Sequence, residues 1–178
     1  MSRSVLLAFA IACAGAQARA APADPAWFAI LAQNAGDGWM EAEAEILGAW
    51  EETGSEVLNM IQARGEVALD EGDYPAAIGH LTALLDHTSE HAMGYQLRAM
   101  AYWLIGDYGP AAADLQRTLV LEPKQYLALT QLGTMLEELG DNAAAAEALR
   151  RSLEINPHQQ DAADALARLD AADNGMDV

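Results

Sequence analysis

The chain has 178 residues, 52% of them hydrophobic, and a formal net charge of −18 because 27 acidic residues oppose nine lysines and arginines. Its length and apolar content suffice for one folded domain with its own core. Nucleic acid and anionic membrane surfaces attract basic stripes, and the sequence contains none. We therefore expect no nucleic-acid partner and no insertion into a membrane once the leader described next is removed.

The first twenty residues form a segment of a different kind. Arg3 precedes an uninterrupted apolar run from Val5 to Ala16, and two small-x-small sites follow at residues 16–18 and 18–20. This pattern is typical of a secretory signal peptide, and the run is too short to span a bilayer. We expect cleavage near residues 18–20, so that a bacterial periplasmic or secreted protein remains.

The single cysteine, Cys13, lies inside this predicted signal peptide. Ala10-Ile11-Ala12-Cys13 faintly resembles a bacterial lipobox, but a larger residue usually occupies the place of Ala10, which makes lipidation at Cys13 the less favoured alternative. Cleavage near residues 18–20 would leave a chain without cysteine, and therefore without disulfides, thiol catalysis or cysteine-based zinc sites.

Residues 21–57 are predicted to form an N-terminal pair of helices. Asp24-Pro25 is typical of a helix start, and Gly36-Asp37-Gly38 separates this first helix from a second one over Trp39–Glu52. Apolar residues recur three and four apart on one face of the second helix, at Trp39, Ala42, Ile46 and Trp50. Two interpretations stay open: a degenerate repeat ahead of the units described next, or two unrelated helices that cap them.

A step of 34 residues runs through the rest of the chain. It connects Gly72-Asp73, Gly106-Asp107 and Gly140-Asp141. The same step joins Ala77, Ala111 and Ala145; Leu81, Leu115 and Leu149; and Gly65, Ala99 and Gly133. A fixed period of this length indicates an array of similar supersecondary units. We divide residues 58–178 into three units, 58–91, 92–125 and 126–159, followed by a capping helix and a tail.

Each unit is predicted to contain two helices. They lie near Glu56–Asp70, Tyr74–Asp86, Ala92–Ile105, Tyr108–Leu121, Tyr126–Leu139 and Asn142–Ile155, with the capping helix near Gln159–Ala171. The repeated glycine fits the left-handed residue that ends a helix, and the aspartate after it suits the N-cap of the next helix. Small residues at Gly65, Ala99 and Gly133 would let the paired helices approach closely.

These repeated positions resemble the tetratricopeptide repeat family. The positions that carry the resemblance are Tyr95, Tyr102, Gly106, Tyr108, Ala111, Leu115, Pro123 and Leu132-Gly133, and it covers about Leu58 to Pro157. It implies an all-α fold, a right-handed superhelical array of antiparallel helix pairs in which the first helix of each pair lines a concave groove. The family as a whole binds peptides and proteins, while the short exported bacterial members that this chain resembles have no defined activity.

The family geometry implies a set of residues that face this groove. They are Asn59, Gln62 and Glu66 in the first unit, Met93, Gln96, Met100 and Trp103 in the second, and Leu127, Thr130 and Thr134 in the third. Methionine and tryptophan suit an adaptable apolar peptide site. The alternative is that the N-terminal helices or the capping helix fold back and bury them.

Charge narrows the expected partner. The predicted groove contains no lysine or arginine, and this disfavours the family's basic clamp on a peptide's C-terminal carboxylate. An acidic rim at Glu66, Asp70, Glu137 and Glu138 favours a neutral or basic protein or extended peptide.

Signatures of catalysis and of metal binding are absent from the sequence. It contains no Gly-rich phosphate loop, no HExxH and no Gly-x-Ser-x-Gly. His87 and His91 are four apart, but no cysteine or third histidine accompanies them, so we predict solvated turn residues; His158 appears isolated in sequence. We predict a non-catalytic scaffold without metal or cofactor.

Two functions follow from these observations. The first is an exported protein- or peptide-binding scaffold that uses the groove. The alternative is a structural subunit or assembly factor of a cell-envelope complex, which would dock through exposed aromatic side chains of the N-terminal helices at Trp27, Phe28, Trp39 and Trp50.

Overall fold

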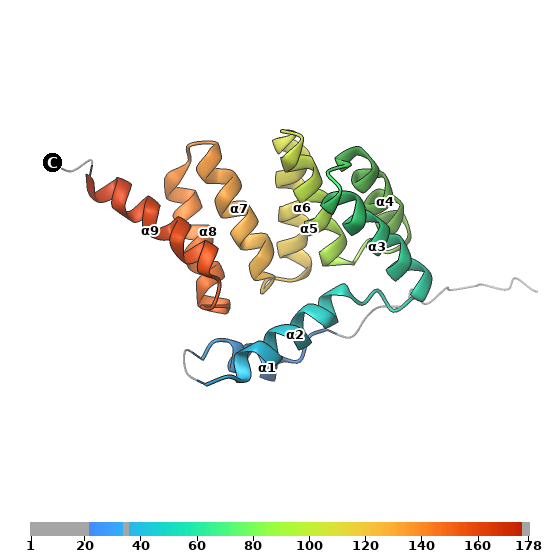
Figure 1. Ribbon diagram of the computed structural model, residues 1–178, viewed down its shortest axis with the longest axis horizontal. Coiled ribbons are helices and arrows are strands. Elements are labelled where there is room, and N and C mark those ends of the chain that lie inside the picture. Colours follow the sequence, from blue (N-terminus) through green and yellow to red (C-terminus); the bar gives the residue numbers. More distant parts are fainter. Residues whose placement is uncertain (1–21, 34–35, 176–178) are drawn as a thin grey trace, which may run out of the picture.

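The computed structural model describes residues 22–33 and 36–175, and these residues form nine α-helices and no strand (Figure 1). The helices are α1 (Pro25–Leu31), α2 (Gly38–Glu51), α3 (Glu56–Asp70), α4 (Tyr74–His87), α5 (Ala92–Leu104), α6 (Tyr108–Leu121), α7 (Tyr126–Glu138), α8 (Asn142–Ile155) and α9 (Gln160–Gly175). The predicted signal peptide, with Cys13, lies outside the described residues. None of the helices in the described part of the chain is long and apolar enough to cross a membrane.

Helices α3 to α8 form three stacked pairs, α3–α4, α5–α6 and α7–α8, and α9 packs on α8 at the far end (Figure 1). The predicted all-α array of helix pairs with a capping helix is therefore confirmed. Helices α2 to α8 begin and end within one residue of their predicted bounds, and α9 continues to Gly175, four residues beyond its predicted end.

The repeated glycine–aspartate pair has the predicted role in two of the three turns. Gly72, Gly106 and Gly140 all have positive φ, between 75° and 81°. The carboxylates of Asp73 and Asp141 each accept a hydrogen bond, at 3.1 Å, from the backbone N–H three residues later. Asp107 makes no such side-chain bond. The prediction was wrong there because the residue three positions later is Pro110, which has no N–H to donate.

Close approach within the pairs explains two other repeated glycines. A Cβ atom on Gly65 would lie 2.7 Å from Leu81 Cγ, and one on Gly133 would lie 2.6 Å from Leu149 Cγ. Real Cβ atoms do not approach a neighbour so closely. Leu81 and Leu149, each on the second helix of its pair, therefore pack directly against the backbone of the first helix.

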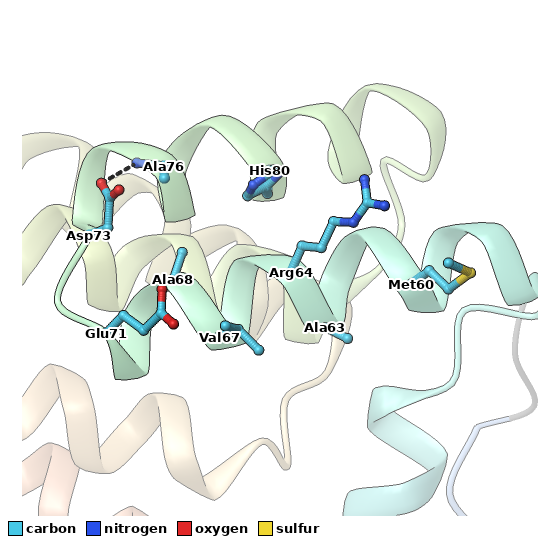
Figure 2. A pocket seen from close by; sticks show the side chains of 9 residues that line it. All are labelled: Met60, Ala63, Arg64, Val67, Ala68, Glu71, Asp73, Ala76 and His80. Atoms are coloured by element: carbon cyan, nitrogen blue, oxygen red, sulfur yellow. Dashed lines mark hydrogen bonds between the residues drawn. The ribbon is translucent and has the colours of Figure 1, made fainter.

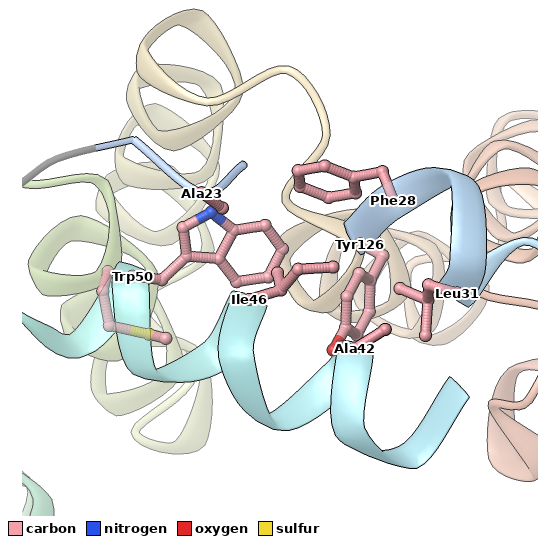
Figure 3. Packing of buried hydrophobic residues seen from close by; sticks show 8 residues of the cluster. Ala23, Phe28, Leu31, Ala42, Ile46, Trp50 and Tyr126 are labelled. Atoms are coloured by element: carbon pink, nitrogen blue, oxygen red, sulfur yellow. The ribbon is translucent and has the colours of Figure 1, made fainter. Parts of the chain in front are cut away.

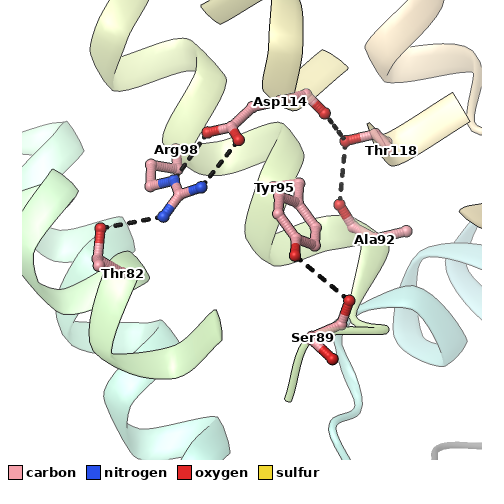
Figure 4. Close-up of polar contacts among 7 residues, drawn as sticks. All are labelled: Thr82, Ser89, Ala92, Tyr95, Arg98, Asp114 and Thr118. Carbon is pink, nitrogen blue, oxygen red and sulfur yellow. Dashed lines mark hydrogen bonds and ion pairs between the residues drawn. The ribbon is translucent and has the colours of Figure 1, made fainter. Parts of the chain in front are cut away.

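A partly buried ion pair within the second unit also contacts the first unit (Figure 4). Arg98 donates from Nε and Nη2 to the two carboxylate oxygens of Asp114 at 2.7 and 2.8 Å, and from Nη1 to Thr82 Oγ1 of the preceding unit at 3.1 Å. The hydrogen bond to Asp114 raises the pKa of the Arg98 guanidinium. A bidentate pair of this kind fixes the side chain, and here it also fixes one unit on the next.

The N-terminal hairpin, helices α1 and α2, lies across the array instead of extending it (Figure 1). Its apolar side packs against Met93 of α5 and Tyr126 of α7, forming one buried cluster (Figure 3). The Trp50 ring lies 5.3 Å from that of Tyr126 and 6.0 Å from that of Phe28. The hairpin is thus a strap on the side of the first helices, and it does not stack on α3 as a preceding repeat would.

Hydrogen bonds and a ring stack join the same hairpin to α7 and to the turn between α8 and α9. Glu43 of α2 accepts hydrogen bonds from Tyr126 Oη at 3.2 Å and from Asn156 Nδ2 at 2.8 Å. The Trp39 ring stacks on the His158 ring, with centroids 4.1 Å apart and an interplanar angle of 11°. The prediction that His158 is isolated was therefore wrong, because its contacts come from the opposite end of the sequence.

Candidate peptide-binding groove

A groove of about 820 Å³ opens on the side of the array formed by the first helices. Helices α5 and α7 supply its floor, and α2, α3 and α9 its walls. The predicted residues that line it are Glu66, Met93, Gln96, Met100, Trp103, Leu127, Thr130 and Thr134. Those that the sequence analysis missed are Leu47, Glu51, Leu97, Gln131, Asp161, Asp164, Ala165 and Arg168.

The apolar residues of the second unit divide into a covered and an open part. Met93 is buried under the N-terminal hairpin, as one of the two interpretations of these residues required. Met100 stays exposed at the other end of α5, and Trp103 is half-buried. The hairpin therefore covers the part of the groove near Met93 and leaves the part near Met100 accessible.

Hydrogen bonds between α5 and α7 hold the floor of the groove. Gln96 Nε2 donates to Gln131 Oε1 at 2.8 Å, and Trp103 Nε1 donates to Glu138 Oε2 at 2.7 Å. The side-chain amides of Gln96 and Gln131 are buried, yet Gln131 Nε2 has no hydrogen-bond partner among the described residues. A buried donor without a partner is costly.

Two predicted groove residues lie elsewhere. Asn59 accepts from the backbone N–H of Thr53 at 2.9 Å and donates to Glu52 at 2.8 Å, so it holds the turn between α2 and α3. This bond from Asn59 is the main reason why the pKa of the Glu52 carboxyl is lowered. Gln62 is buried, and its amide is hydrogen-bonded to His91 and to Glu66. Neither side chain lines the groove.

The histidine pair differs from its prediction in one member. His87 is exposed at the end of α4, but His91 is buried, with Nε2 hydrogen-bonded to Gln62 Oε1. Burial lowers the pKa of His91 to about 4, against the opposing effect of the Glu52 charge. His91 is a structural residue of the α3–α5 contact. No group of three or more potential ligands for a metal ion occurs in the part of the chain that the structure describes.

Carboxylates dominate the walls of the groove. Glu51, Glu66, Asp161 and Asp164 line it. Arg168 of α9 lines it too, so the prediction of a groove without basic residues was wrong; α9 was treated only as a cap, and its inner face closes one side. The Arg168 guanidinium already pairs with Glu137, at 3.2 Å.

The predicted acidic rim is realised only in part. Glu66 lines the groove, whereas Asp70 does not. Glu137 and Glu138 accept hydrogen bonds from Arg168 and Trp103, so they brace the walls. The carboxylates that line the groove come from α2, α3 and α9.

The aromatic residues of the N-terminal helices face the protein's own interior. Phe28 and Trp50 are buried, and the partly buried Trp27 and Trp39 pack against the same cluster. The exposed aromatic surface on which docking through these helices would rest is therefore not found.

Comparison with known proteins agrees with this geometry. A sequence profile described as tetratricopeptide repeat matches residues 63–119 and 97–160, together more than half of the chain. The chain belongs to the tetratricopeptide repeat family. It is similar to a TPR repeat-containing protein of Rhizobium etli, at 26% identity over 113 residues, covering 64% of this chain and 55% of that protein.

A second relative of this tetratricopeptide repeat protein is the SGT1 homolog of Bos taurus, 32% identical over 108 residues, covering 61% of this chain and 32% of the bovine protein. The chain thus spans about half of the first relative and a third of the second.

Solved tetratricopeptide repeat structures share the fold. The Sgt2 TPR domain from Aspergillus fumigatus matches with a TM-score of 0.65 at 22% identity, covering 69% of this chain and 83% of that domain. The first TPR of Spaghetti (RPAP3) bound to HSP90 peptide SRMEEVD matches with a TM-score of 0.62 at 22% identity, covering 65% and 91%. At this identity the likeness concerns the fold alone.

Proposed function

We propose that this protein is a non-catalytic scaffold that binds an extended, neutral or basic segment of another protein in the groove between α2, α5, α7 and α9. The observation that carries the proposal is the groove itself. It combines the accessible side chains of Met100 and Trp103 with a wall of carboxylates. Methionine and tryptophan adapt to varied apolar side chains, and a large aromatic residue is a frequent energetic centre of an interface.

The charge of the groove supports a ligand unlike the peptides named for two structural neighbours. One neighbour is bound to the HSP90 peptide SRMEEVD and another to the HSP70 peptide SGPTIEEVD, both rich in acidic residues. Here the lining of the groove contains four carboxylates and one guanidinium, and that guanidinium is already paired with Glu137. A peptide with the same sign of charge would be repelled, so we expect lysine or arginine, or no charge, in the bound segment.

We also propose that binding takes place after export, in the periplasm or outside the cell, with a signal peptide cleaved near residues 18–20. The support is the sequence pattern of residues 1–20. Mass spectrometry of the protein from its bacterial host tests this. We expect an N-terminus at Arg19 or Ala21, and a lipid-modified Cys13 or an intact leader would contradict it.

Selection from a random peptide library tests the binding proposal. We expect the selected peptides to combine apolar with basic or uncharged residues, and their affinity, measured by fluorescence anisotropy, to fall when the basic residues are replaced by glutamate. Met100→Glu should weaken binding by about tenfold or more, because a charge enters the apolar part of the groove. Val120→Glu places the same change at an exposed site on α6 and should have no effect. Acidic peptides from the selection, or equal affinities for the two variants, would refute the proposal.

A further inference from the structure

The open face of the first unit is the largest group of exposed apolar side chains on one helix in the described part of the chain. Val57, Met60 and Val67 of α3 are 54% to 66% exposed. A depression of about 490 Å³ lies between α3 and α4, lined by Met60, Arg64, Val67, Glu71 and His80 among others (Figure 2). The face lies apart from the groove, since the residues that line the two hollows differ.

The register of the repeat shows what kind of surface this is. Met60 corresponds to Gly94 and Ala128, and Val67 corresponds to Ala101 and Met135. In the second and third units these positions are buried, with Ala101 and Met135 0% and 1% exposed, whereas Val67 is 54% exposed. Each unit thus has a stacking face, and only that of the first unit is open.

The preceding unit supplies the cover for a stacking face. A Cβ atom on Gly94 would lie 3.0 Å from Leu85 and 3.1 Å from Leu84, both on α4. Thr82 of α4 also accepts a hydrogen bond from Arg98, the counterpart of Arg64. The first unit has no unit before it, because the N-terminal hairpin lies across the array. Terminal repeats normally carry a polar outer face, and this one does not.

We propose that this open face is the interface of a two-fold homodimer, in which α3 and α4 of each copy cover those of the other. Charge complementarity favours a second copy as the occupant. Arg64 and Glu71 both border the depression, and neither side chain has an ion pair or hydrogen bond among the described residues. Seven residues on a helix span about 10 Å, and these two side chains do not pair with each other within the chain. A two-fold axis between them places each Arg64 beside the Glu71 of the other copy.

The opposite end of the array favours a closed dimer over an open chain of copies. Helix α9 covers the last unit with its apolar side, and its charged residues Asp161, Asp164, Arg168 and Asp170 stay exposed, three of them along the groove. An open first unit therefore finds no matching apolar face at the end of another copy. A head-to-tail filament is disfavoured, and an interface of one patch with itself remains.

Sedimentation velocity over a series of concentrations, on the protein expressed from its full sequence, tests the dimer. We expect a monomer–dimer equilibrium that tightens with salt, because the copies repel each other through their net negative charge. Val67→Glu should raise the dissociation constant by about tenfold or more, since it buries an unpaired charge. Val120→Glu, the matched control on α6, should leave the equilibrium unchanged.

A charge exchange makes the test specific. Arg64→Glu and Glu71→Arg should each weaken the dimer, and the double variant should restore it, because every copy then carries both partners in exchanged positions. A protein that stays monomeric at all concentrations would overturn the proposal and assign the face to a different chain. A dimer that survives Val67→Glu, or a double variant no better than the single ones, would also overturn it.

Discussion

Replacing Trp50 by alanine tests how the N-terminal hairpin is held on the array. Trp50 is buried between Phe28 and Tyr126, and it is part of the cluster that covers Met93. Truncation of a buried tryptophan costs about 3–5 kcal/mol. The indole N–H of Trp50, however, is buried without a partner, and its removal returns about 1–3 kcal/mol. We therefore expect a net loss of about 2 kcal/mol.

This loss should appear as local detachment of the hairpin. The three helix pairs stack on one another without the hairpin, so they can stay folded when it comes away. Hydrogen exchange followed by mass spectrometry should show faster exchange in α2 and at the starts of α5 and α7, which the hairpin covers. Exchange in α6 and α8 should change little.

Met40→Ala is the matched control, because Met40 lies on the same helix but is exposed. The reasoning is refuted if Trp50→Ala speeds exchange equally in all helices, since the hairpin would then be an integral part of the stack. It is refuted as well if Trp50→Ala and Met40→Ala behave alike.

Three further predictions concern the array itself. Gly133→Ala should lower the free energy of unfolding by about 1–3 kcal/mol, because the new Cβ meets Leu149 at 2.6 Å. Acidification should destabilise the protein through His91, whose pKa of about 4 lies below the ordinary 6.5. As the pH falls, the imidazole is protonated in the unfolded chain before it is protonated in the folded protein. The contribution of neutral His91 to the free energy of unfolding is therefore fully present above pH 6.5 and is lost as the pH falls toward 4. His91→Gln should make the free energy of unfolding less dependent on pH. Asp114→Ala should cost about 3 kcal/mol, because it leaves the partly buried Arg98 without its partner.

Denaturant unfolding measures all three, and each has its control in the same chain. Gly79→Ala adds a methyl group in open space within α4 and should stabilise the protein by up to about 1 kcal/mol. His87→Gln changes an exposed histidine and should leave the pH dependence intact. Arg150→Ala breaks an exposed ion pair and should cost less than about 1 kcal/mol. Any variant that behaves like its control contradicts the corresponding prediction.

The repeat could be predicted from the sequence because its determinants act locally. A glycine with positive φ and the aspartate after it define a turn within a few residues, and a period of 34 residues repeats that turn. Where local chemistry changed, as at Pro110, the expected cap at Asp107 was absent while the helix still began at Tyr108. Glycine, aspartate and the 34-residue period all mark the same turn, so the helix bounds could still be predicted where the aspartate forms no cap.

The groove was predictable only where the repeat forms it. The predicted residues of the second and third units line it at the positions that their register gives, and their role in binding stays a prediction. A fold-back of the N-terminal helices or the capping helix was left open as an alternative, but the residues of α2 and α9 that line the groove could not be predicted, because no periodic pattern states where a helix outside the array will lie. Gln62 does not line the groove, and one of its two hydrogen-bond partners, His91, is 29 residues away in sequence, so no local signal connects the two.

The strap formed by the N-terminal hairpin sets an order of events during folding. An array of repeats is ordinarily stabilised by contacts between neighbours, so it can form from its beginning while later units are still unfolded. Glu43 and Trp39, however, bind Asn156 and His158, more than a hundred residues away along the chain. The hairpin is the first described segment to be synthesised, and it reaches its place only after the end of α8 has formed. Until then its apolar side, and those of α5 and α7, stay open to other chains.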